Sequence, residues 1–343
     1  ITLENISKQF PGVLALDNVN LTLQKGEVHC LAGQNGCGKS TIIKVISGVY
    51  HPEKGAQIQL DGKLFHHLTP QLSAHYGIQV IYQDLSLFPN FSVAENIAVN
   101  RYLPGGDVWV RRGAMRKQAL AAMQRIGVSI DPDKKVEKLS IADRQLVAIC
   151  RAIAADARLV IMDEPTASLT RQEVNGLLRV VNELKAAGIC VVFVSHRLDE
   201  VMEVADRISV MRDGKLVGTY PASQLDSHEL AFLMTGQRFH YSPLPEKPSA
   251  DQEPMLELRN LSRRGKYQNI NLSLRSGEIV SIVGLLGAGR TELCLSLFGM
   301  THPESGEMRI NGKPVTLRNN HDAIKHGIGY VSEDRLTQGL IME

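Results

Sequence analysis

The sequence predicts an α/β fold built around a mainly parallel β-sheet with helices on both faces. Three observations support this prediction. An apolar run from Val28 to Ala32 leads into a glycine-rich loop that opens a helix. Further short apolar runs alternate with helical patterns along the chain. Polar residues stand where these runs end, which is the edge at which an open parallel sheet forms its binding crevice.

The glycine-rich loop matches a pattern of one glycine, four residues and then Gly-Lys-Ser. Its residues are Gly33, Gln34, Asn35, Gly36, Cys37, Gly38, Lys39 and Ser40, and Thr41 opens the helical pattern that Gly48 closes. Backbone N–H groups of such a loop point at phosphate oxygens, and the helix N-terminus adds a partial positive charge. Lys39 can reach the β- and γ-phosphates of a nucleotide, and Ser40 can hold Mg²⁺. A turn that binds nothing is the alternative, which the flanking strand and helix disfavour.

The remaining elements follow the same alternation. Residues 1–29 alternate apolar and polar side chains and predict two or three antiparallel strands. Later strands are expected at 55–65, 77–82, 158–162 and 189–194, and helical segments at 92–155, 170–188 and 224–234. Ser140 is a suitable N-cap with Asp143 three residues on, and Thr170 with Glu173 forms a capping-box pattern.

The polar residues at the predicted strand ends suit the hydrolysis of a phosphoanhydride. Asp163 can hold Mg²⁺ or its waters, and Glu164 can accept a proton from an attacking water. Gln83 can bridge metal and water, and His196 can donate to the γ-phosphate. Taken singly, each could serve a structural role, but four strand ends converge on one edge of the sheet. We therefore expect Glu164, His196 and Gln83 to be catalytic, and Ser40, Gln83 and Asp163 to hold the metal.

Composition places the chain among ordinary globular proteins. Its 343 residues are 43% hydrophobic and 22% charged, enough for one large domain and part of another. The net charge of +2 and the scattered Lys and Arg residues give no reason to expect a nucleic-acid partner. No apolar stretch is long enough to cross a membrane, and the start of the sequence has no signal-peptide pattern. Five cysteines without a CxxC pair indicate reduced thiols in a cytoplasmic compartment.

The second part of the chain repeats the first. Gly277 stands 251 residues after Gly26, and Gly284 stands 251 residues after Gly33. Residues 240–254 carry four prolines and predict a semi-rigid linker. The expected organisation is a first domain at 1–238, a linker at 239–254 and part of a second, degenerate domain at 255–343. Because the sequence starts at Ile1 without methionine and stops in mid-pattern, we expect both ends to be those of a fragment.

The order of these motifs resembles that of the ATP-binding cassette (ABC) ATPases. Their motifs correspond here to the adenine-stacking Phe10, Walker A at Gly33 to Ser40, the Q-loop Gln83, the signature at Leu139 to Asp143, Walker B at Asp163-Glu164, the D-loop at 168–170 and the switch histidine His196. Phe10 can alternatively pack beneath its own turn. The resemblance implies a P-loop NTPase fold with a mainly parallel core sheet, an antiparallel β subdomain, a helical subdomain and a partial second copy.

Two copies in one chain are similar to the ATPases of the ribose, galactoside and autoinducer importers. The resemblance implies ATP and Mg²⁺ as cofactors, and import of a monosaccharide or related small polar solute. It also implies integral-membrane permease subunits as partners, contacted through residues 85–95, and a solute-binding protein as an indirect one. The chain would be a peripheral protein on the cytoplasmic face of the membrane. Each nucleotide would lie between one cassette's Walker A and the signature serine of the other, here Ser140.

The sequence departs from the family pattern in three places. Ile141 and Ala142 replace the two signature glycines, and Asp143 adds a carboxylate, which predicts a weak signature. The second glycine-rich loop has Arg290 where the first has Lys39. Glu333 stands where the first copy has Gln83. The second loop is expected to contact nucleotide, if at all without efficient turnover, through Gly284, Gly287, Gly289, Arg290 and Thr291.

Two alternative functions remain open. A soluble ABC-type ATPase that acts on ribosomes or DNA would usually carry a basic linker or a coiled-coil insertion. Here the linker has Glu246, Asp251 and Glu253 against a lone Lys247. A nucleotide-binding module without turnover is the other alternative, because the signature is unusual and the second copy is incomplete.

Overall fold

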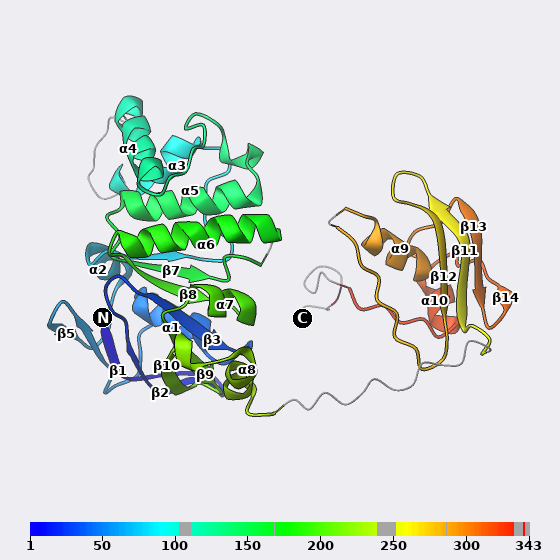
Figure 1. Ribbon diagram of the computed structural model, residues 1–343, viewed down its shortest axis with the longest axis horizontal. Helices are drawn as coiled ribbons and strands as arrows, with labels where there is room; N and C mark the ends of the chain where they lie inside the picture. Colours follow the sequence, from blue (N-terminus) through cyan, green and yellow to red (C-terminus); the bar gives the residue numbers. More distant parts are fainter. Residues whose placement is uncertain (103–110, 168, 239–251, 286, 333–338, 340–343) are drawn as a thin grey trace. The chain divides into compact units, whose positions relative to one another are not determined.

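The computed structural model describes residues 1–102, 111–167, 169–238, 252–285, 287–332 and 339. The chain forms two compact units, residues 1–240 and 241–343 (Figure 1). Most of the linker expected at 239–254 lies outside the described residues. Among the residues that are described, we find no helix with the length and apolar character needed to cross a bilayer.

A six-stranded sheet forms the centre of the first unit. Its strand order is β10 (Lys215–Pro221), β9 (Arg207–Arg212), β3 (Val28–Gly33), β8 (Cys190–Val194), β7 (Leu159–Asp163) and β6 (Ile78–Ile81). All neighbouring pairs are parallel except the hairpin of β9 and β10. Every residue of β3 and β8 is buried, as expected for central strands covered on both faces. The carboxyl ends of the parallel strands therefore share one edge.

A four-stranded antiparallel sheet packs beside it, in the order β2 (Val13–Thr22), β1 (Thr2–Phe10), β4 (Gln57–Leu60) and β5 (Lys63–Phe65). Helix α1 (Lys39–Ile46) buries Ile42, Ile43, Val45 and Ile46 in the core shared by the two sheets. Residues 1–29 thus contain two antiparallel strands, as predicted, while their third apolar run becomes the parallel strand β3. The short helix α2 (Pro70–His75) was not predicted.

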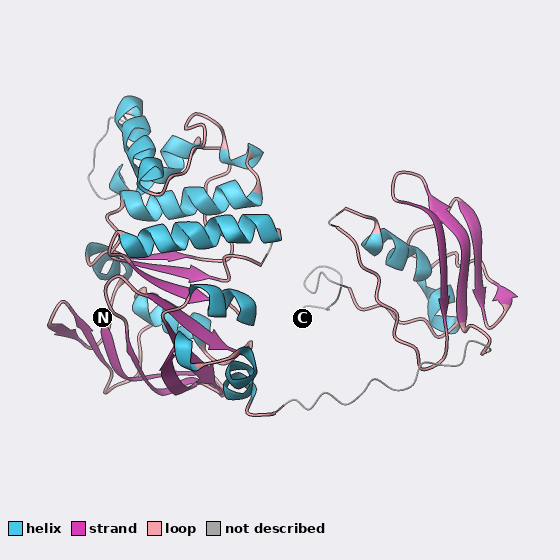
Figure 2. Ribbon diagram, in the orientation of Figure 1, coloured by secondary structure: helices cyan, strands magenta, loops and turns pink. Residues whose placement is uncertain are grey.

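Helices cover the other face of the six-stranded sheet (Figure 2). They are α3 (Val93–Tyr102), α4 (Arg112–Arg125), α5 (Ile141–Ala154), α6 (Arg171–Ala186), α7 (Leu198–Val204) and α8 (Ser227–Thr235), with 3-10 turns at Val136–Lys138 and Ala222–Gln224. The capping box of Thr170 and Glu173 is confirmed, as is Ser140 as the N-cap of α5. Helix α7, which carries the buried Glu200, was not predicted.

The second unit contains a similar antiparallel sheet. Its order is β12 (Tyr267–Leu274), β11 (Leu256–Arg263), β13 (Ser305–Ile310) and β14 (Lys313–Pro314), and it packs with α9 (Arg290–Leu297) and α10 (Asn320–Lys325). Residues 277–285 correspond to the region of β3 but form no strand. There Ile279 is 90% exposed and Val283 87% exposed. The two copies therefore differ in the element that precedes the glycine-rich loop.

Candidate functional site

The first glycine-rich loop connects the end of β3 to the start of α1. Gly38 is the N-cap of α1 with φ 103°, a left-handed conformation that favours glycine. A Cβ atom on Gly38 would lie 2.6 Å from the carbonyl oxygen of Ala15, and one on Gly33 would lie 2.5 Å from that of Met211. Gly38 has no side chain that could cap α1, so the N–H groups of the first turn of α1 remain available as donors to a ligand bound in the loop. This backbone fits a phosphate group.

Lys39 lies inside the loop that it follows. Its Nζ donates to the carbonyl oxygens of Gly33 and Gln34, each at 2.8 Å, and lies 3.8 Å from Sγ of Cys37. The side chain is buried despite its charge. Burial raises the pKa of the Cys37 thiol, although the Lys39 ammonium acts in the opposite direction, so the thiol stays protonated. The loop therefore contains one buried positive charge and no competing thiolate.

Asp163 ends β7 and lies near Ser40. The pKa of the Asp163 carboxyl is above its usual range because burial raises it, followed by the neighbouring Glu164 carboxylate. The Lys39 ammonium and a hydrogen bond from Ser40 act against this shift. A bound divalent cation would relieve the crowding of negative charge and would hold Asp163 ionised. The pair of Asp163 and Ser40 thus fits Mg²⁺, which takes one or two protein oxygens beside phosphate.

Glu164 and His196 form a pair at the same edge of the sheet. Oε1 of Glu164 lies 3.1 Å from Nδ1 of His196. Glu164 has φ 49°, and its N–H donates to the carbonyl oxygen of Val194 at 3.0 Å, so the turn after β7 is fastened to the end of β8. A non-glycine residue in this conformation is uncommon and is often found at functional sites. The carboxylate is placed to accept a proton and the imidazole to orient it.

Gln83 follows β6, the neighbour of β7. Because Ile81 pairs with Met162 in parallel register, Gln83 lies at the edge that also carries Glu164. Its side chain is exposed. The next residues, Leu85 and Ser86, both have positive φ angles, and their carbonyl oxygens accept hydrogen bonds from Arg151 of α5 at 3.0 and 2.7 Å. Sequence reasoning missed Arg151, because its partners lie more than sixty residues away and no local pattern marks the contact.

Phe10 ends β1 immediately before a turn. Its ring is half-buried and meets the ring of Tyr50 edge-to-face, with 5.2 Å between the centroids. Nζ of Lys8 also lies over the Phe10 ring, 5.6 Å from its centroid. Phe10 therefore has the packing partner that the alternative interpretation of the sequence expected. The adenine-stacking role of Phe10 stays a prediction.

The predicted signature lies at the start of α5. Oγ of Ser140 accepts a hydrogen bond from the N–H of Asp143 at 3.1 Å, and Ile141 is 51% exposed. The serine therefore caps its own helix, and a bulky side chain stands beside it. Ser168 of the predicted D-loop lies outside the described residues.

The second glycine-rich loop joins residues 277–285 to α9. Gly289 is the N-cap with φ 85°, and Gly287 also has a positive φ. Gly284, Arg290 and Thr291 are exposed. Leu286 of this loop and Glu333 lie outside the described residues. The loop keeps the backbone of the first one but does not bury its cation.

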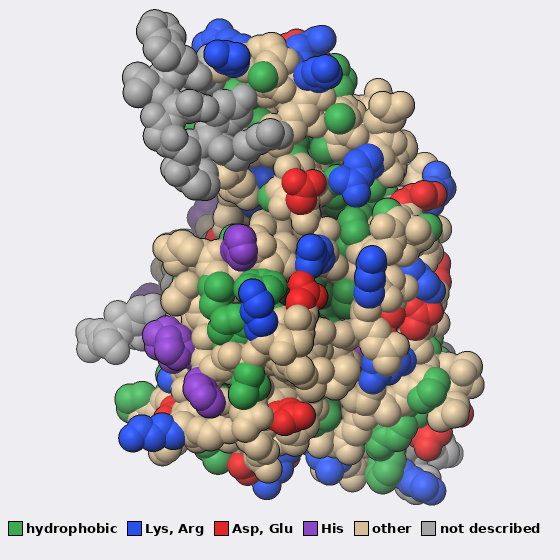
Figure 3. Space-filling view, turned by 90° about the vertical axis from the view of Figure 1, so that its left-hand side faces the viewer, with side chains coloured by type: hydrophobic (Ala, Val, Ile, Leu, Met, Phe, Trp, Pro, Cys, Tyr) green, Lys and Arg blue, Asp and Glu red, His purple; other side chains and the backbone are tan. Residues whose placement is uncertain are grey.

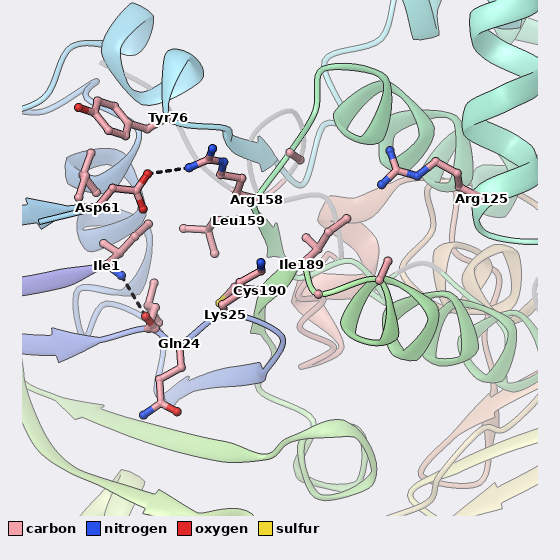
Figure 4. Close-up of a pocket in the computed structure, with 15 residues that line it drawn as sticks. Ile1, Gln24, Lys25, Asp61, Tyr76, Arg125, Arg158, Leu159, Ile189 and Cys190 are labelled. Carbon is pink, nitrogen blue, oxygen red and sulfur yellow. Dashed lines mark hydrogen bonds and ion pairs between the residues drawn. The ribbon is translucent and has the colours of Figure 1, made fainter.

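A groove of about 450 Å³ lies elsewhere on the first unit (Figure 4). It is lined by Lys25, Arg125, Arg158 and Asp61 among others, and Arg158 pairs with Asp61 at 2.6 Å. These residues surround the amino ends of β7 and β8, so the groove is at the opposite edge of the sheet from Asp163 and His196. On the face shown in Figure 3, side chains of both charges are interspersed. The candidate site is therefore the carboxyl edge of the six-stranded sheet.

Comparison with known proteins identifies the family of the chain. The family model described as "ABC transporter" matches residues 16–167 and again residues 267–343. A ribose import ATP-binding protein of Rubrobacter xylanophilus is 42% identical over all of this chain and 69% of its own length. A putative ribose/galactose/methyl galactoside import ATP-binding protein of Agrobacterium fabrum is also 42% identical, over all of this chain and 68% of its own length. The chain thus spans about two thirds of the length of these relatives.

Solved structures agree with the fold. A nucleotide-free ATP-binding cassette from an ABC transporter is 29% identical, with a TM-score of 0.58 over 64% of this chain and 90% of its own. The ADP conformation of MJ1267, an ATP-binding cassette of an ABC transporter, is 28% identical, with a TM-score of 0.59 over 68% of this chain and 94% of its own. The predicted α/β cassette fold is confirmed. The chain belongs to the ABC transporter family and is an ATPase of this class.

Proposed function

We propose that the chain is the ATP-hydrolysing part of a membrane importer for a monosaccharide or a related small polar solute. The carrying observation is the pair of Glu164 and His196, 3.1 Å apart, on the sheet edge that also holds Asp163 and the glycine-rich loop. The importer class follows from the names of the similar proteins, which are ribose or galactoside import ATP-binding proteins.

Different residues of the site would bind the phosphates, hold the metal and transfer the proton. Backbone N–H groups of the first loop and the Lys39 ammonium hold the phosphates. Ser40, Asp163 and Gln83 hold Mg²⁺, which when bound neutralises charge on the phosphate oxygens. Glu164 accepts a proton from the water that attacks the γ-phosphorus, while the bond to the β-phosphate oxygen breaks. His196 fixes the orientation of Glu164 and donates to the γ-phosphate.

A second cassette would complete the site. In the arrangement implied by the family resemblance, the first loop faces a signature on another cassette, in the same chain or in a second one. The second loop of this chain has an exposed Arg290 where the first loop has the buried Lys39. We expect one site that turns over and one that binds nucleotide weakly or not at all.

The permease would dock beside Gln83. Phe88 and Phe91 stack on each other with 5.2 Å between ring centroids and stay 46% and 43% exposed. A pair of exposed aromatic rings is typical of an interaction surface. This pair lies within residues 85–95, the segment expected to pass motion to the permease. A chain that docks there would be a peripheral protein on the cytoplasmic face of the membrane. A solute-binding protein would act on the other side.

Uptake into proteoliposomes tests the proposal. Proteoliposomes that contain the permease subunits and the full-length ATP-binding protein should take up radiolabelled ribose or galactose only when ATP is supplied on the side of the ATP-binding protein. Replacing Phe88 and Phe91 by Ser should weaken assembly with the permease while ATP binding is kept. Uptake that proceeds equally without ATP would overturn the proposal.

A further inference from the structure

Helix α7 carries a buried carboxylate that contacts residues next to the candidate site. Glu200 is 1% exposed. Its Oε2 accepts hydrogen bonds from Oγ1 of Thr166 at 2.5 Å and from Oγ of Ser195 at 3.2 Å. Both hydroxyl groups are buried as well. One carboxylate oxygen therefore joins two segments that are about thirty residues apart in the chain.

The second oxygen of this carboxylate has its own partner. Oε1 accepts a hydrogen bond from Nη1 of Arg197 at 2.7 Å, and the N–H of Arg197 donates to Oγ of Ser195 at 3.0 Å. A buried carboxylate is stable only when it is paired and hydrogen-bonded, and here two hydroxyl groups and one guanidinium donate to it. Both oxygens of the Glu200 carboxyl group therefore have hydrogen-bond partners.

The two segments that meet on Glu200 are those that carry the catalytic pair. Thr166 lies two residues after Glu164, and Ser195 lies immediately before His196. Glu164 itself has φ 49°, a conformation that the surrounding structure has to hold in place. The side chain of Thr166, anchored on Glu200, fixes the turn that contains Glu164. The side chain of Ser195, on the same oxygen, fixes the start of the His196 loop.

We propose that Glu200 is a positioning residue for ATP hydrolysis, which holds the Glu164 turn and the His196 loop in mutual register. This inference rests on the proposed function, because it assigns Glu200 to the turnover step of that site. Glu200 does not touch the reacting atoms; it acts through Thr166 and Ser195. Its effect is expected on the rate of the chemical step and not on nucleotide affinity, which depends on the loop at 33–41.

The substitution Glu200→Gln tests the charge without changing the size of the side chain. A glutamine amide accepts hydrogen bonds only through its oxygen. Its NH₂ group would therefore stand opposite at least one of the three donors, which are Thr166, Ser195 and Arg197, and that hydrogen bond would be lost. The expected result is a fall in kcat of about tenfold or more, as for small misplacements of catalytic groups, with KM for ATP changed less than about twofold. The assay is ATP turnover by the cassette assembled with its permease, normalised to bound nucleotide.

A matched control lies on the same helix. Glu203 is exposed and pairs with Arg171 at 3.3 Å on the surface. Glu203→Gln removes the same charge from α7 and should leave kcat unchanged. Thr166→Ser keeps the hydroxyl and should retain turnover, whereas Thr166→Val should lower kcat. In the Glu200→Gln background, Thr166→Val should add little, because both changes break the same bond.

A second readout does not depend on turnover. The imidazole NMR resonances of His196 should move in Glu200→Gln toward their positions in Glu164→Ala, since both changes disturb the same pair; Glu203→Gln should leave them in place. Unchanged His196 resonances or an unchanged kcat in Glu200→Gln would overturn the inference. If Glu200→Gln does not fold, equal kcat values for Thr166→Ser and Thr166→Val would do the same. Failure of the proposed function is distinct, because solute uptake with the unsubstituted protein would then proceed equally without ATP while the resonance shift still occurred.

Discussion

The two glycine-rich loops share one backbone design. Gly38 and Gly289 cap their helices with φ angles of 103° and 85°. A Cβ atom on Gly38 would collide with the carbonyl oxygen of Ala15, and one on Gly289 with that of Lys266, which stands at the equivalent position 251 residues later. Each loop opens a helix of eight residues. The described residues of the two loops therefore share the same helix-cap conformation.

The side chains around the two loops differ in charge and burial. Lys39 is buried and donates to two loop carbonyl oxygens, whereas Arg290 is exposed. Helix α9 has Glu292 in its first turn, but α1 has no acid there. A hydrogen bond from Lys266 at 2.9 Å lowers the pKa of the Glu292 carboxyl and keeps it ionised. An anion at a helix N-terminus opposes phosphate. The glycines thus give the two loops the same helix cap, whereas the charges around them differ, which predicts that the loops differ in nucleotide affinity.

The largest difference between the loops should appear in turnover. Glu164→Gln removes the proton acceptor of the first site and should lower kcat by about 10²- to 10⁴-fold, the range for general-base catalysis. Nucleotide binding should persist, because the loop at 33–41 is intact. Phosphate release under saturating ATP measures the rate. Turnover near the unsubstituted rate would contradict the assignment of Glu164 as the proton acceptor of the active loop.

The contributions of the two loop cations, Lys39 and Arg290, to ATP affinity can be compared directly by substitution. Lys39→Ala removes a buried ammonium and the charged hydrogen bonds that it would donate to the phosphates, which are worth about 2–3 kcal/mol, so affinity for ATP should fall roughly 30- to 150-fold. Arg290→Ala should change the affinity of the first site by less than about twofold, because it belongs to the other unit. Titration calorimetry with a slowly hydrolysed ATP analogue measures both. Equal losses in the two variants would contradict the assignment.

The pH dependence of Mg²⁺ binding tests the role of Asp163 as a metal ligand in the first site. The pKa of Asp163 is raised, so its carboxyl takes up a proton at a higher pH than an ordinary aspartate. Mg²⁺ competes with that proton, so apparent Mg²⁺ affinity should fall as the pH drops through the raised pKa, by about tenfold per unit below it. Asp163→Asn should weaken Mg²⁺ binding and flatten this dependence. An unchanged profile in the variant would assign the titration to another group.

Sequence patterns predicted the features that depend on local spacing or on parallel topology. The loop at 33–41 and the caps at Ser140 and Thr170 follow from residue type and short intervals. Asp163 and His196 could be placed on one edge because parallel strands end together. The contacts of Arg151 with the backbone at Leu85 and Ser86, and those of Glu200 with Thr166, join distant segments. No periodicity marks such contacts, so only the tertiary structure reveals them.

The smallest expected effect concerns the charge at the start of α9. Glu292→Gln removes the first-turn carboxylate and frees Lys266 from its partner, which leaves an extra positive charge near the second loop. Because a negative charge is removed from the helix N-terminus, phosphate or ATP should bind this loop about two- to fivefold more tightly. The gain should shrink at high ionic strength, because the site is exposed. Lys266→Gln, which removes the cation instead, should weaken binding. If both substitutions left nucleotide binding to the second loop unchanged in a Lys39→Ala background, the charge around that loop would not be what limits its affinity.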